Sequence, residues 1–436
     1  MFRNLVEVYA NILHLRFTDA FAKLPAATLQ NISPSSFAAR LWATFLYTGG
    51  RLFLNIFLPV RNPENIRGKI WLYVVSKNNY ESLHFLKEKY PEAVFIAGQN
   101  KEIGIYNKKV NRLSTRFKFL YYYKFLPLLW GLYRLKGKRA LRFFDLIFVA
   151  TGYYELSLRY LQKYKPAAII FANDHNTDPR ALLLAAKALN IPTVYIQHAS
   201  VSTSFPPLQF DLSLLEGQDA WDKYRQCGPI SGEIKLIGMP KADIFLAQKN
   251  LRTTIHRIGI AANIIDETEP IRNLLSTLTR EFPDMIFTLR PHPGDKRNFG
   301  FVKEFGPNVR FSESKTESAF TLLKQQDALI AADSSIHLEA TMLNILCFYY
   351  RFNTTEFIPD YYGYVQHGLI EQAKDLNHLI RLLQEFRSRR PQVYERARYY
   401  NAVLGTQYEG KSHELAVKYI TEFLSRNQTR KALTVT

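Results

Sequence analysis

The stretch that decides the fold is AAIIFANDHNTDPRALLLAAKALNIPTVYIQHA, residues 167–199. Two short apolar runs, 167–174 and 193–199, are typical of buried strands. Between them, Asp178 can cap a helix and Asn190 can end it. Strand, helix and strand in this order predict a parallel pair whose crossover helix covers one face of a sheet.

The same alternation continues on both sides of this stretch. Further apolar runs that we predict as strands lie at 70–75, 93–98, 146–152, 212–217, 256–263, 285–293, 309–313, 328–335 and 345–350. Continuous apolar strands separated by helices indicate parallel sheets covered on both faces. The runs form two separate series, so the sequence predicts an α/β protein with two Rossmann-like, doubly wound domains facing a cleft.

The chain of 436 residues is long enough for several domains. We expect a helical N-terminal extension at 1–64 and a first Rossmann-like domain at 65–248. A second Rossmann-like domain is expected at 249–375 and C-terminal helices at 376–436. The apolar stretch 41–60 has nearly the length of a membrane span, but Arg51 interrupts it. An interfacial or partly buried helix is therefore expected there, because a central arginine is costly inside a bilayer.

The charge of the chain points to an anionic partner. The formal net charge is +19, and between Lys101 and Arg142 there are twelve Lys or Arg against one acid. This insert, 101–142, contains FKFLYYYKFLPLLWGLYRLKGKR. Interleaved aromatic and basic residues suit an anionic membrane surface, whereas the sequence has no recognisable nucleic-acid motif. The two cysteines, Cys227 and Cys347, suggest neither a disulfide framework nor a zinc site.

Polar residues follow two predicted strands of the second series. In TLRPHPGDKRNF, prolines fix the backbone around His292, and Arg290 is adjacent. In ALIAADSSIHLEATMLN, Ser334 and Ser335 open a helix, and Glu339 follows one turn later. A helix N-terminus with two hydroxyls can bind phosphate, and a carboxylate there can accept hydrogen bonds from a ribose. We expect the two motifs at neighbouring strand positions, holding one nucleotide-linked donor.

Polar residues also follow the strands of the first series. Asp174 and His175 end one predicted strand, and Gln197 and His198 end the next. If these strands are adjacent, Asp174 lies near His198 and raises its basicity. Asp174, His198 and Glu216 are the candidate catalytic bases, whose order stays open, and His175 and Gln197 are candidate acceptor-binding residues.

The His-Pro motif followed by Asp-Ser-Ser and an acidic residue resembles the donor domain of GT-B glycosyltransferases. It resembles two groups among them: the bacterial CDP-glycerol glycerophosphotransferases with related teichoic-acid and capsule polymerases, and the bacterial sialyltransferases with His-Pro and Ser-Ser motifs. The resemblance implies that His292, Ser334 and Ser335 bind the phosphate of a nucleotide donor, possible forms being CMP- or CDP-linked. Gln197-His198 is similar to the Gln-His-Gly phrase of the capsule enzymes, with Ala199 replacing glycine.

We therefore expect a glycosyltransferase that builds a bacterial surface polysaccharide, such as capsule, O-antigen or a teichoic-acid-like polymer. Its partners would be a nucleotide-activated donor, a lipid-linked or polymeric saccharide acceptor and the inner face of the cell membrane, where it would be peripheral. No separate cofactor is expected. No metal is implied, because no carboxylate pair follows a donor-domain strand. The alternatives are a UDP-sugar 2-epimerase-like enzyme, a polyol-phosphate transferase and, more remotely, a basic nucleic-acid-binding protein.

Overall fold

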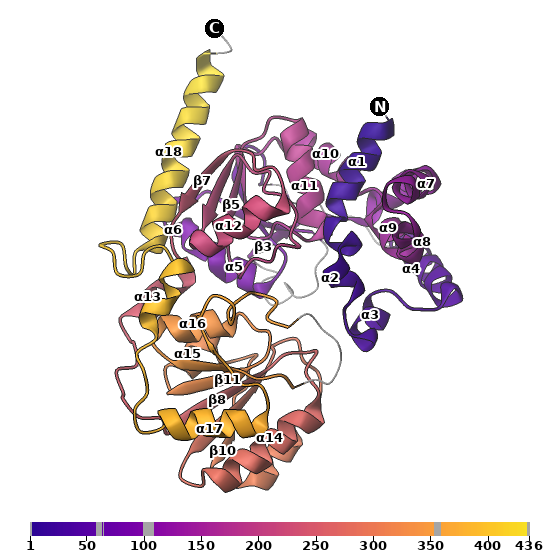
Figure 1. Cartoon of the computed structure of the whole chain (residues 1–436). Coiled ribbons are helices and arrows are strands. Elements are labelled where there is room, and N and C mark those ends of the chain that lie inside the picture. Colours follow the sequence, from indigo (N-terminus) through magenta and orange to yellow (C-terminus); the bar gives the residue numbers. More distant parts are fainter. Residues whose placement is uncertain (1, 58–62, 64, 99–108, 353–358, 434–436) are drawn as a thin grey trace. The chain divides into compact units, whose positions relative to one another are not determined.

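The computed structural model describes residues 2–57, 63, 65–98, 109–352 and 359–433. The chain divides into two compact units (Figure 1). Unit 1 comprises Met1–Leu215, Ala220–Ile237 and His413–Thr436, and unit 2 comprises Glu216–Asp219 and Gly238–Ser412. Each unit contains one parallel sheet, so the predicted two-domain α/β fold is confirmed.

The limits of the units differ from the predicted domain limits. The predicted donor domain, 249–375, lies within unit 2, which begins at 238 and continues to 412. The expected C-terminal helices divide between the units, because α17 (Leu376–Phe386) belongs to unit 2 and nearly all of α18 (Ser412–Leu433) to unit 1. Residues 101–108 of the predicted insert lie outside the described residues.

The sheet of unit 1 has seven strands in the order β3-β2-β1-β4-β5-β6-β7. Its strands are β1 (Ile70–Val74), β2 (Val94–Ala97), β3 (Val110–Arg112), β4 (Ala168–Phe171), β5 (Thr193–Ile196), β6 (Leu212–Leu215) and β7 (Glu233–Leu236). In the central strands, Trp71 pairs with Ile169 and Phe171 with Tyr195, and all four are buried. A strand buried on both faces has no polar alternation, which is why these strands read as continuous apolar runs.

Helices pack on this sheet, and all of them except the C-terminal α18 lie between its strands in the sequence. They are α5 (Lys77–His84), α6 (Leu86–Lys89), α10 (Tyr153–Tyr164), α11 (Thr177–Ala188), α12 (Gln218–Cys227) and α18. Leu182 and Leu183 of α11 pack in the same core as Trp71 and Phe171. The helix ends before Asn190, which takes a left-handed φ of 53°. The predicted strand–helix–strand unit at 167–199 is thus confirmed.

The first residues of unit 1 and a later segment form a separate helical layer (Figure 1). Its elements are α1 (Phe2–Ile12), η1 (His14–Phe17), α2 (Asp19–Ala22), α3 (Ala26–Ile32), α4 (Phe37–Phe57), η3 (Arg116–Lys124), α7 (Phe125–Lys136), α8 (Lys138–Arg142) and α9 (Phe144–Ala150). Tyr9, Ile12, Leu128 and Leu132 are buried together in its core. None of the helices among the described residues is long and apolar enough to span a membrane.

One predicted strand in this region is wrong. Residues 146–152 read as a strand but lie mainly in helix α9. Ile147 and Ala150 of this helix are buried in the core that α1 and α7 also line. A short helix packed on several sides by other helices is apolar all round, so hydrophobic periodicity does not separate it from a buried strand.

The sheet of unit 2 has six strands in the order β10-β9-β8-β11-β12-β13. Its strands are β8 (Arg257–Ala262), β9 (Ile286–Pro291), β10 (Val309–Phe311), β11 (Ala328–Ala331), β12 (Leu346–Tyr349) and β13 (Glu371–Gln372). Its helices are η4 (Pro240–Ala242), α13 (Asp243–Leu246), α14 (Thr268–Glu281), η5 (Gly300–Phe305), α15 (Ala319–Leu323), α16 (Ile336–Met342), α17 and η6 (Tyr394–Tyr399). All pairings are parallel, so the six strands end at one common edge.

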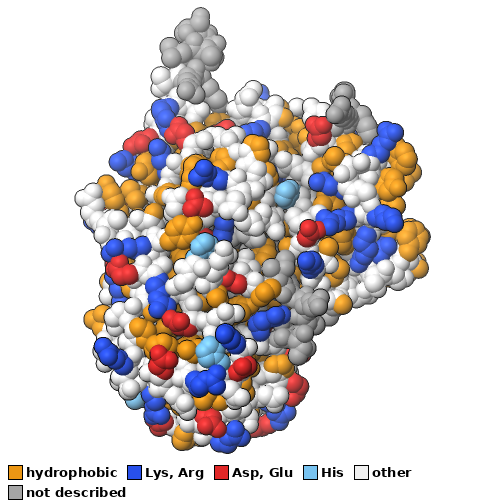
Figure 2. Space-filling model, viewed as in Figure 1, with side chains coloured by type: hydrophobic (Ala, Val, Ile, Leu, Met, Phe, Trp, Pro, Cys, Tyr) orange, Lys and Arg blue, Asp and Glu red, His pale blue; other side chains and the backbone are white. Residues whose placement is uncertain are grey.

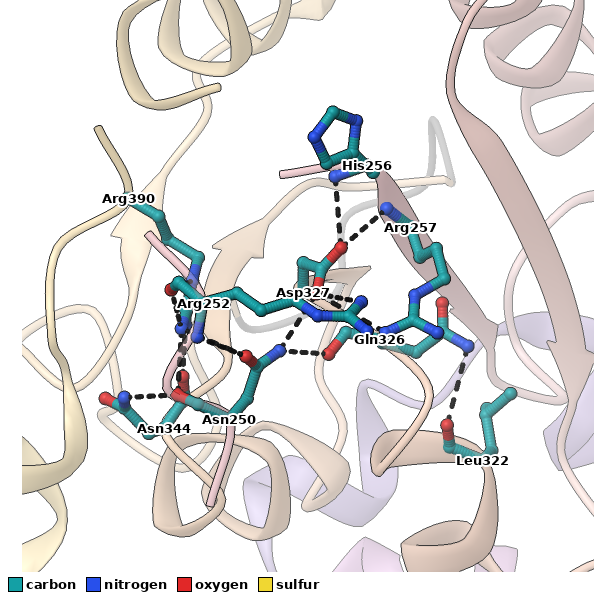
Figure 3. Close-up of polar contacts among 9 residues, drawn as sticks. All are labelled: Asn250, Arg252, His256, Arg257, Leu322, Gln326, Asp327, Asn344 and Arg390. Carbon is teal, nitrogen blue, oxygen red and sulfur yellow. Dashed lines mark hydrogen bonds and ion pairs between the residues drawn. The ribbon is translucent and has the colours of Figure 1, made fainter. Parts of the chain in front are cut away.

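A polar network around a buried carboxylate occupies the opposite, amino-terminal edge of this sheet (Figure 3). Asp327, fully buried just before β11, accepts hydrogen bonds from the backbone N–H groups of His256 and Arg257 at 3.0 and 2.9 Å. Asn250 Nδ2 donates to its other oxygen at 3.0 Å, and Arg252 forms an ion pair with it at 3.3 Å. These bonds tie the start of β8 to the start of β11. We assign this network a structural role, since the ligand edge of a parallel sheet is the other one.

Candidate functional site

Three loops meet at the carboxyl edge of the unit 2 sheet. They follow β8, β9 and β11 and carry Asn263, His292 and Ser334 respectively. The prediction that the His-Pro and Ser-Ser motifs follow neighbouring strands is wrong, because β8 lies between β9 and β11. Two inter-strand steps separate the motifs by about 10 Å at the strand ends.

The loop after β8 joins the other two loops. Asn263 Nδ2 donates to the backbone oxygen of Asp333 at 3.1 Å, in the loop after β11. Arg297, in the loop after β9, donates to the backbone oxygen of Asn263 at 2.8 Å and also to that of Asp266. The same guanidinium forms an ion pair with Asp295. The three loops are therefore one hydrogen-bonded edge, which orders the motifs relative to each other.

Asp266 is the most perturbed acid of this edge. Its side chain is 2% exposed, and one oxygen accepts from the backbone N–H of Asn263 at 2.6 Å. Its Oδ1 has no hydrogen-bond partner among the described residues. Burial raises the pKa of Asp266 to about 7, and the nearby carboxylates of Asp333 and Asp295 add to the rise that the Asn263 bond and Arg297 oppose. The acid thus titrates near neutrality at the ligand edge of the sheet.

His292 is exposed, and its ring is oriented by the tight turn that follows. The backbone N–H of Gly294 donates to its Nδ1 at 3.0 Å, and the N–H of Asp295 donates to its backbone oxygen at 2.8 Å. A neutral imidazole that accepts at Nδ1 carries its proton on Nε2. His292 therefore presents Nε2 as a hydrogen-bond donor.

Arg290, predicted beside His292 as a donor ligand, bonds within the fold. It is 5% exposed, and its guanidinium donates to Ser312 Oγ at 2.8 Å and to the backbone oxygen of Glu317 at 2.7 Å. Burial lowers its pKa, while the Glu317 carboxylate, 3.8 Å away, opposes this. These contacts hold the segment before α15 against the sheet.

The Ser-Ser motif opens α16 as predicted. Both Ser334 and Ser335 are half-buried, and the backbone N–H of Ile336 lies 3.4 Å from Ser334 Oγ. Asp333, directly before them, accepts from Tyr349 Oη at 2.8 Å and from the backbone N–H of Tyr361 at 2.6 Å. These two hydrogen bonds, from the end of β12 and from Tyr361, fix the turn that presents the two hydroxyls.

A buried charge cluster lies beside α16. Lys241 Nζ donates to Glu339 Oε1 at 2.5 Å, and the Glu339 side chain is 10% exposed. Glu216, a member of unit 2 by its contacts, is 2% exposed. Burial raises the pKa of Glu216 to about 8, with Lys241 opposing the rise and the carboxylates of Glu339 and Asp219 adding to it. Sequence reasoning found the two glutamates but not Lys241, which carries the opposite charge.

The carboxyl edge of the unit 1 sheet holds a second candidate group. Asp174 is 1% exposed; His175 Nδ1 lies 2.9 Å from one of its oxygens, and Tyr224 Oη donates to the other at 2.6 Å. Burial acts to raise the pKa of Asp174, but the hydrogen bond and charge of His175 and the bond from Tyr224 outweigh it and lower the pKa. Asp174 is thus an ionised carboxylate that orients the half-buried His175 ring.

The prediction that β4 and β5 are adjacent is confirmed, which sets the Asp174 and His198 loops side by side. The hydrogen bonds of Asp174, however, go to His175 and Tyr224, the latter a residue that sequence reasoning missed. Gln197 is buried, and its Nε2 donates to the backbone oxygen of Ala199 at 3.0 Å, while His198 is half-buried.

No family model and no curated protein matches this sequence. Solved structures do match it in fold. The UDP-GlcNAc 2-epimerase from Methanocaldococcus jannaschii covers 81% of this chain and 99% of its own at 14% identity, with a TM-score of 0.52. S. aureus MnaA in a co-structure with UDP covers 82% and 97% at 12% identity, with a TM-score of 0.51. The wall teichoic acid polymerase TagF with CDPG covers 91% and 100% at 11% identity, with a TM-score of 0.51.

These likenesses and the two sheet orders define the class of the fold. The protein has a GT-B-like fold, built from two α/β units with parallel sheets. Identities of 11–14% limit the comparison to the fold. Among the described residues no group of three or more His, Cys, Asp or Glu is arranged to hold a metal ion.

Proposed function

We propose that the protein is a glycosyltransferase that uses a nucleotide-activated donor to build a bacterial surface polysaccharide. The acceptor would be lipid-linked or polymeric, and the reaction would take place at the cytoplasmic face of the membrane. The observation that carries the proposal is the hydrogen-bonded edge of unit 2, where Asn263 and Arg297 join the loops of His292 and Ser334. Ligands of open parallel sheets bind at this edge.

The donor's phosphates fit the groups present on this edge. The Nε2–H of His292 and the hydroxyls of Ser334 and Ser335 are donors that can offset the charge of a leaving phosphate. The estimated spacing of about 10 Å between the two motifs is within the reach of an extended nucleoside diphosphate. Lys241, which is half-buried, supplies a cation beside α16, paired with Glu339.

The acceptor hydroxyl requires a base, and the protonation states distinguish the three candidates. At neutral pH Glu216, with a pKa of about 8, is mainly protonated and is better suited to donate a proton than to accept one. Asp174 is ionised and orients His175, so this pair can accept a proton on the imidazole. We therefore propose Asp174–His175 as the base, with His198 and Gln197 on the adjacent loop orienting the acceptor.

Nucleotide binding tests the donor half of the proposal. A nucleotide present at about a hundred times its dissociation constant stabilises the fold by about 2.7 kcal/mol, so CMP, CDP, UDP and GDP can be compared by thermal unfolding. Replacing His292 by alanine should weaken the best nucleotide by about 10-fold, the worth of one hydrogen bond to a charged group. His256→Ala is the matched control, because His256 is also exposed but precedes β8 at the opposite edge of the sheet. The proposal would be contradicted if His292→Ala and His256→Ala weakened nucleotide binding equally, or if no nucleotide stabilised the protein.

A UDP-sugar 2-epimerase remains a second candidate function. It is favoured by the likeness in fold to the M. jannaschii epimerase, which covers 99% of that chain. The two reactions differ in their need for an acceptor. An epimerase converts the nucleotide-sugar alone, whereas a glycosyltransferase or a polyol-phosphate transferase releases nucleotide in proportion to acceptor added. Turnover of UDP-sugar without acceptor, followed by NMR of the sugar, would decide for the epimerase.

A further inference from the structure

Helix α4 has its polar residues on the inside and its apolar residues on the outside. The inward stripe contains Arg40, Thr44, Tyr47, Arg51 and Asn55, spaced three or four residues apart. Arg51 is 4% exposed and donates to Thr115 Oγ1 at 3.0 Å and to Tyr47 Oη at 2.8 Å. A surface helix of a globular protein has the reverse arrangement, with the apolar stripe facing the core.

The outward face of α4 is made of large apolar side chains. Its most exposed members are Phe37 (64%), Trp42 (60%), Phe45 (65%), Phe53 (58%), Ile56 (72%) and Phe57 (64%). Scattered exposed apolar residues are ordinary, but a continuous face of this kind marks an interaction site. The polar inward stripe fixes the helix in this orientation, so the exposure is built into the fold.

A second apolar group lies on the helices that follow η3. Leu126 and Trp130 of α7 are 70% and 59% exposed, and Leu141 of α8 is 48% exposed. Helices α4, η3, α7 and α8 contain no aspartate or glutamate. Of their lysines and arginines beyond the inward stripe, Arg134, Lys136, Lys138 and Arg139 are exposed, Arg116, Lys124 and Arg142 are half-buried, and Lys118 is buried. Figure 2 shows hydrophobic and basic side chains interspersed on this part of unit 1.

A groove of about 550 Å³ lies between these helices. Its apolar walls are formed by Phe37, Phe125, Leu129, Leu141 and Phe144. Two arginines also line it, Arg40 and Arg142. Arg40 is 6% exposed and bonds the backbone oxygens of the turn before α4, while its Nε has no hydrogen-bond partner among the described residues. Apolar walls with two guanidinium groups match an acyl chain with an anionic headgroup.

From this geometry we infer that the apolar face of α4, together with α7 and α8, docks on an anionic lipid bilayer, with an acyl chain of an anionic lipid in the groove. We call this face the docking surface. Charge complementarity decides for lipid over a second copy of this chain, because two copies would bring the same basic residues together. The docking surface deepens the proposed function by naming its membrane contact, but it is argued from unit 1 alone and its test needs no nucleotide.

Tryptophan fluorescence provides a direct test, because the four tryptophans divide by environment. Trp42 and Trp130 are on the docking surface, whereas Trp71 is buried and Trp221 is half-buried. On adding vesicles of phosphatidylcholine with phosphatidylglycerol, we expect the protein to co-sediment and its emission to shift to the blue. Acyl-chain-brominated lipid should quench the emission, and Trp42→Phe with Trp130→Phe should abolish both effects. Binding to phosphatidylcholine alone should be at least about 10-fold weaker.

Charged substitutions on the apolar face separate insertion from charge attraction. The double variant Phe45→Glu with Ile56→Glu should weaken vesicle binding by at least about 100-fold, since two large apolar side chains no longer leave water. The control is Ile244→Glu with Leu251→Glu, in unit 2, where these residues are 72% and 78% exposed. Both double variants should keep the wild-type melting temperature, since all four side chains lie outside the core.

Three results would overturn the inference. The first is equal vesicle binding by the wild type and the Phe45→Glu, Ile56→Glu variant. The second is co-sedimentation without any shift or quenching of tryptophan emission, which would indicate attraction by charge only. The third is a dimer in sedimentation velocity that this variant dissociates while no vesicle binding is seen, which would make a second copy the occupant. Loss of vesicle binding with intact nucleotide binding in the variant is expected, so failure here is distinguishable from failure of the proposed function.

Discussion

Replacing Glu216 by glutamine tests the buried cluster of unit 2 through the pH dependence of stability. The pKa of Glu216 is about 8 in the fold, against 4.5 for an unperturbed glutamate. The folded protein therefore keeps a proton that the unfolded chain has released. Stability is full below the lower value and falls as the pH rises towards the higher one. Between about pH 5 and about pH 8 the loss from this one group is about 3.5 kcal/mol.

The Glu216→Gln variant keeps the size of the side chain and removes the titration. We expect its free energy of unfolding to fall less than that of the wild type over this range, by about 3.5 kcal/mol. Urea unfolding followed by far-UV circular dichroism at several pH values measures the difference. Glu339→Gln should narrow the pH range over which stability is lost, because the Glu339 carboxylate helps to raise the pKa of Glu216. Lys241→Met should widen this pH range, because the Lys241 ammonium opposes the rise in that pKa.

The refuting result is that the free energy of unfolding changes with pH in the same way in the wild type and in Glu216→Gln. If the wild type and Glu216→Gln lose the same stability between about pH 5 and about pH 8, Glu216 is ionised throughout. The side chain would then have a solvated environment in place of the buried one next to Lys241 and Glu339. An ionised Glu216 could not act as the proton donor, so this role would be excluded.

Two further substitutions test the packing that supports this site. Gly217→Ala would put a Cβ atom 2.4 Å from the backbone carbon of Tyr400, so we expect a loss of about 1–3 kcal/mol. The control is Gly68→Ala, whose new Cβ atom meets open space. Only the left-handed φ of 70° disfavours alanine there, at a cost of about 1 kcal/mol. Equal melting temperatures of the two variants would contradict the close approach at Gly217. Asp327→Asn should cost about 3 kcal/mol, because a buried carboxylate with several partners is lost, whereas the half-exposed Asp284 should tolerate the same change within about 1 kcal/mol. Similar thermal shifts in both would mean that the Asp327 network is solvated.

The sequence predicts elements well where local signals agree. In 167–199, apolar runs and an asparagine after the helix support strand–helix–strand, and the structure agrees. The predicted cap is wrong, because the N-cap residue of α11 is Asn176, and Asp178 lies in the first turn and accepts a hydrogen bond from Tyr73. In 146–152 only the apolar run was present, and the helix α9 forms because other helices surround it. That surrounding is a tertiary property, so no local pattern reports it. The short strands β3 and β7 were missed because edge strands lack a continuous apolar run.

The candidate site was predictable by position but not by contact. Polar residues after strands identified the loops of His292 and Ser334, and the same rule would have found Asn263 after β8. No sequence pattern indicates the strand order β9-β8-β11, so the prediction that β9 and β11 are neighbours is wrong. Arg297 gave no signal, since it lies in a polar loop and acts through backbone oxygens. Lys241 gave none either, because its partner Glu339 is distant in sequence.

Buried carboxylates at the two edges of the unit 2 sheet differ in how their charge is compensated, and this difference supports a ligand at one edge. At the amino-terminal edge, Asp327 receives hydrogen bonds on both oxygens and pairs with arginine, as a structural carboxylate does. At the other edge, burial raises the pKa of Asp266 to about 7, and beside α16 it raises that of Glu216 to about 8. Such acids cost stability at neutral pH, and packing alone gives no reason to keep them. Acids held in this way cluster where proteins bind or transform a substrate, which is the use we propose for this edge.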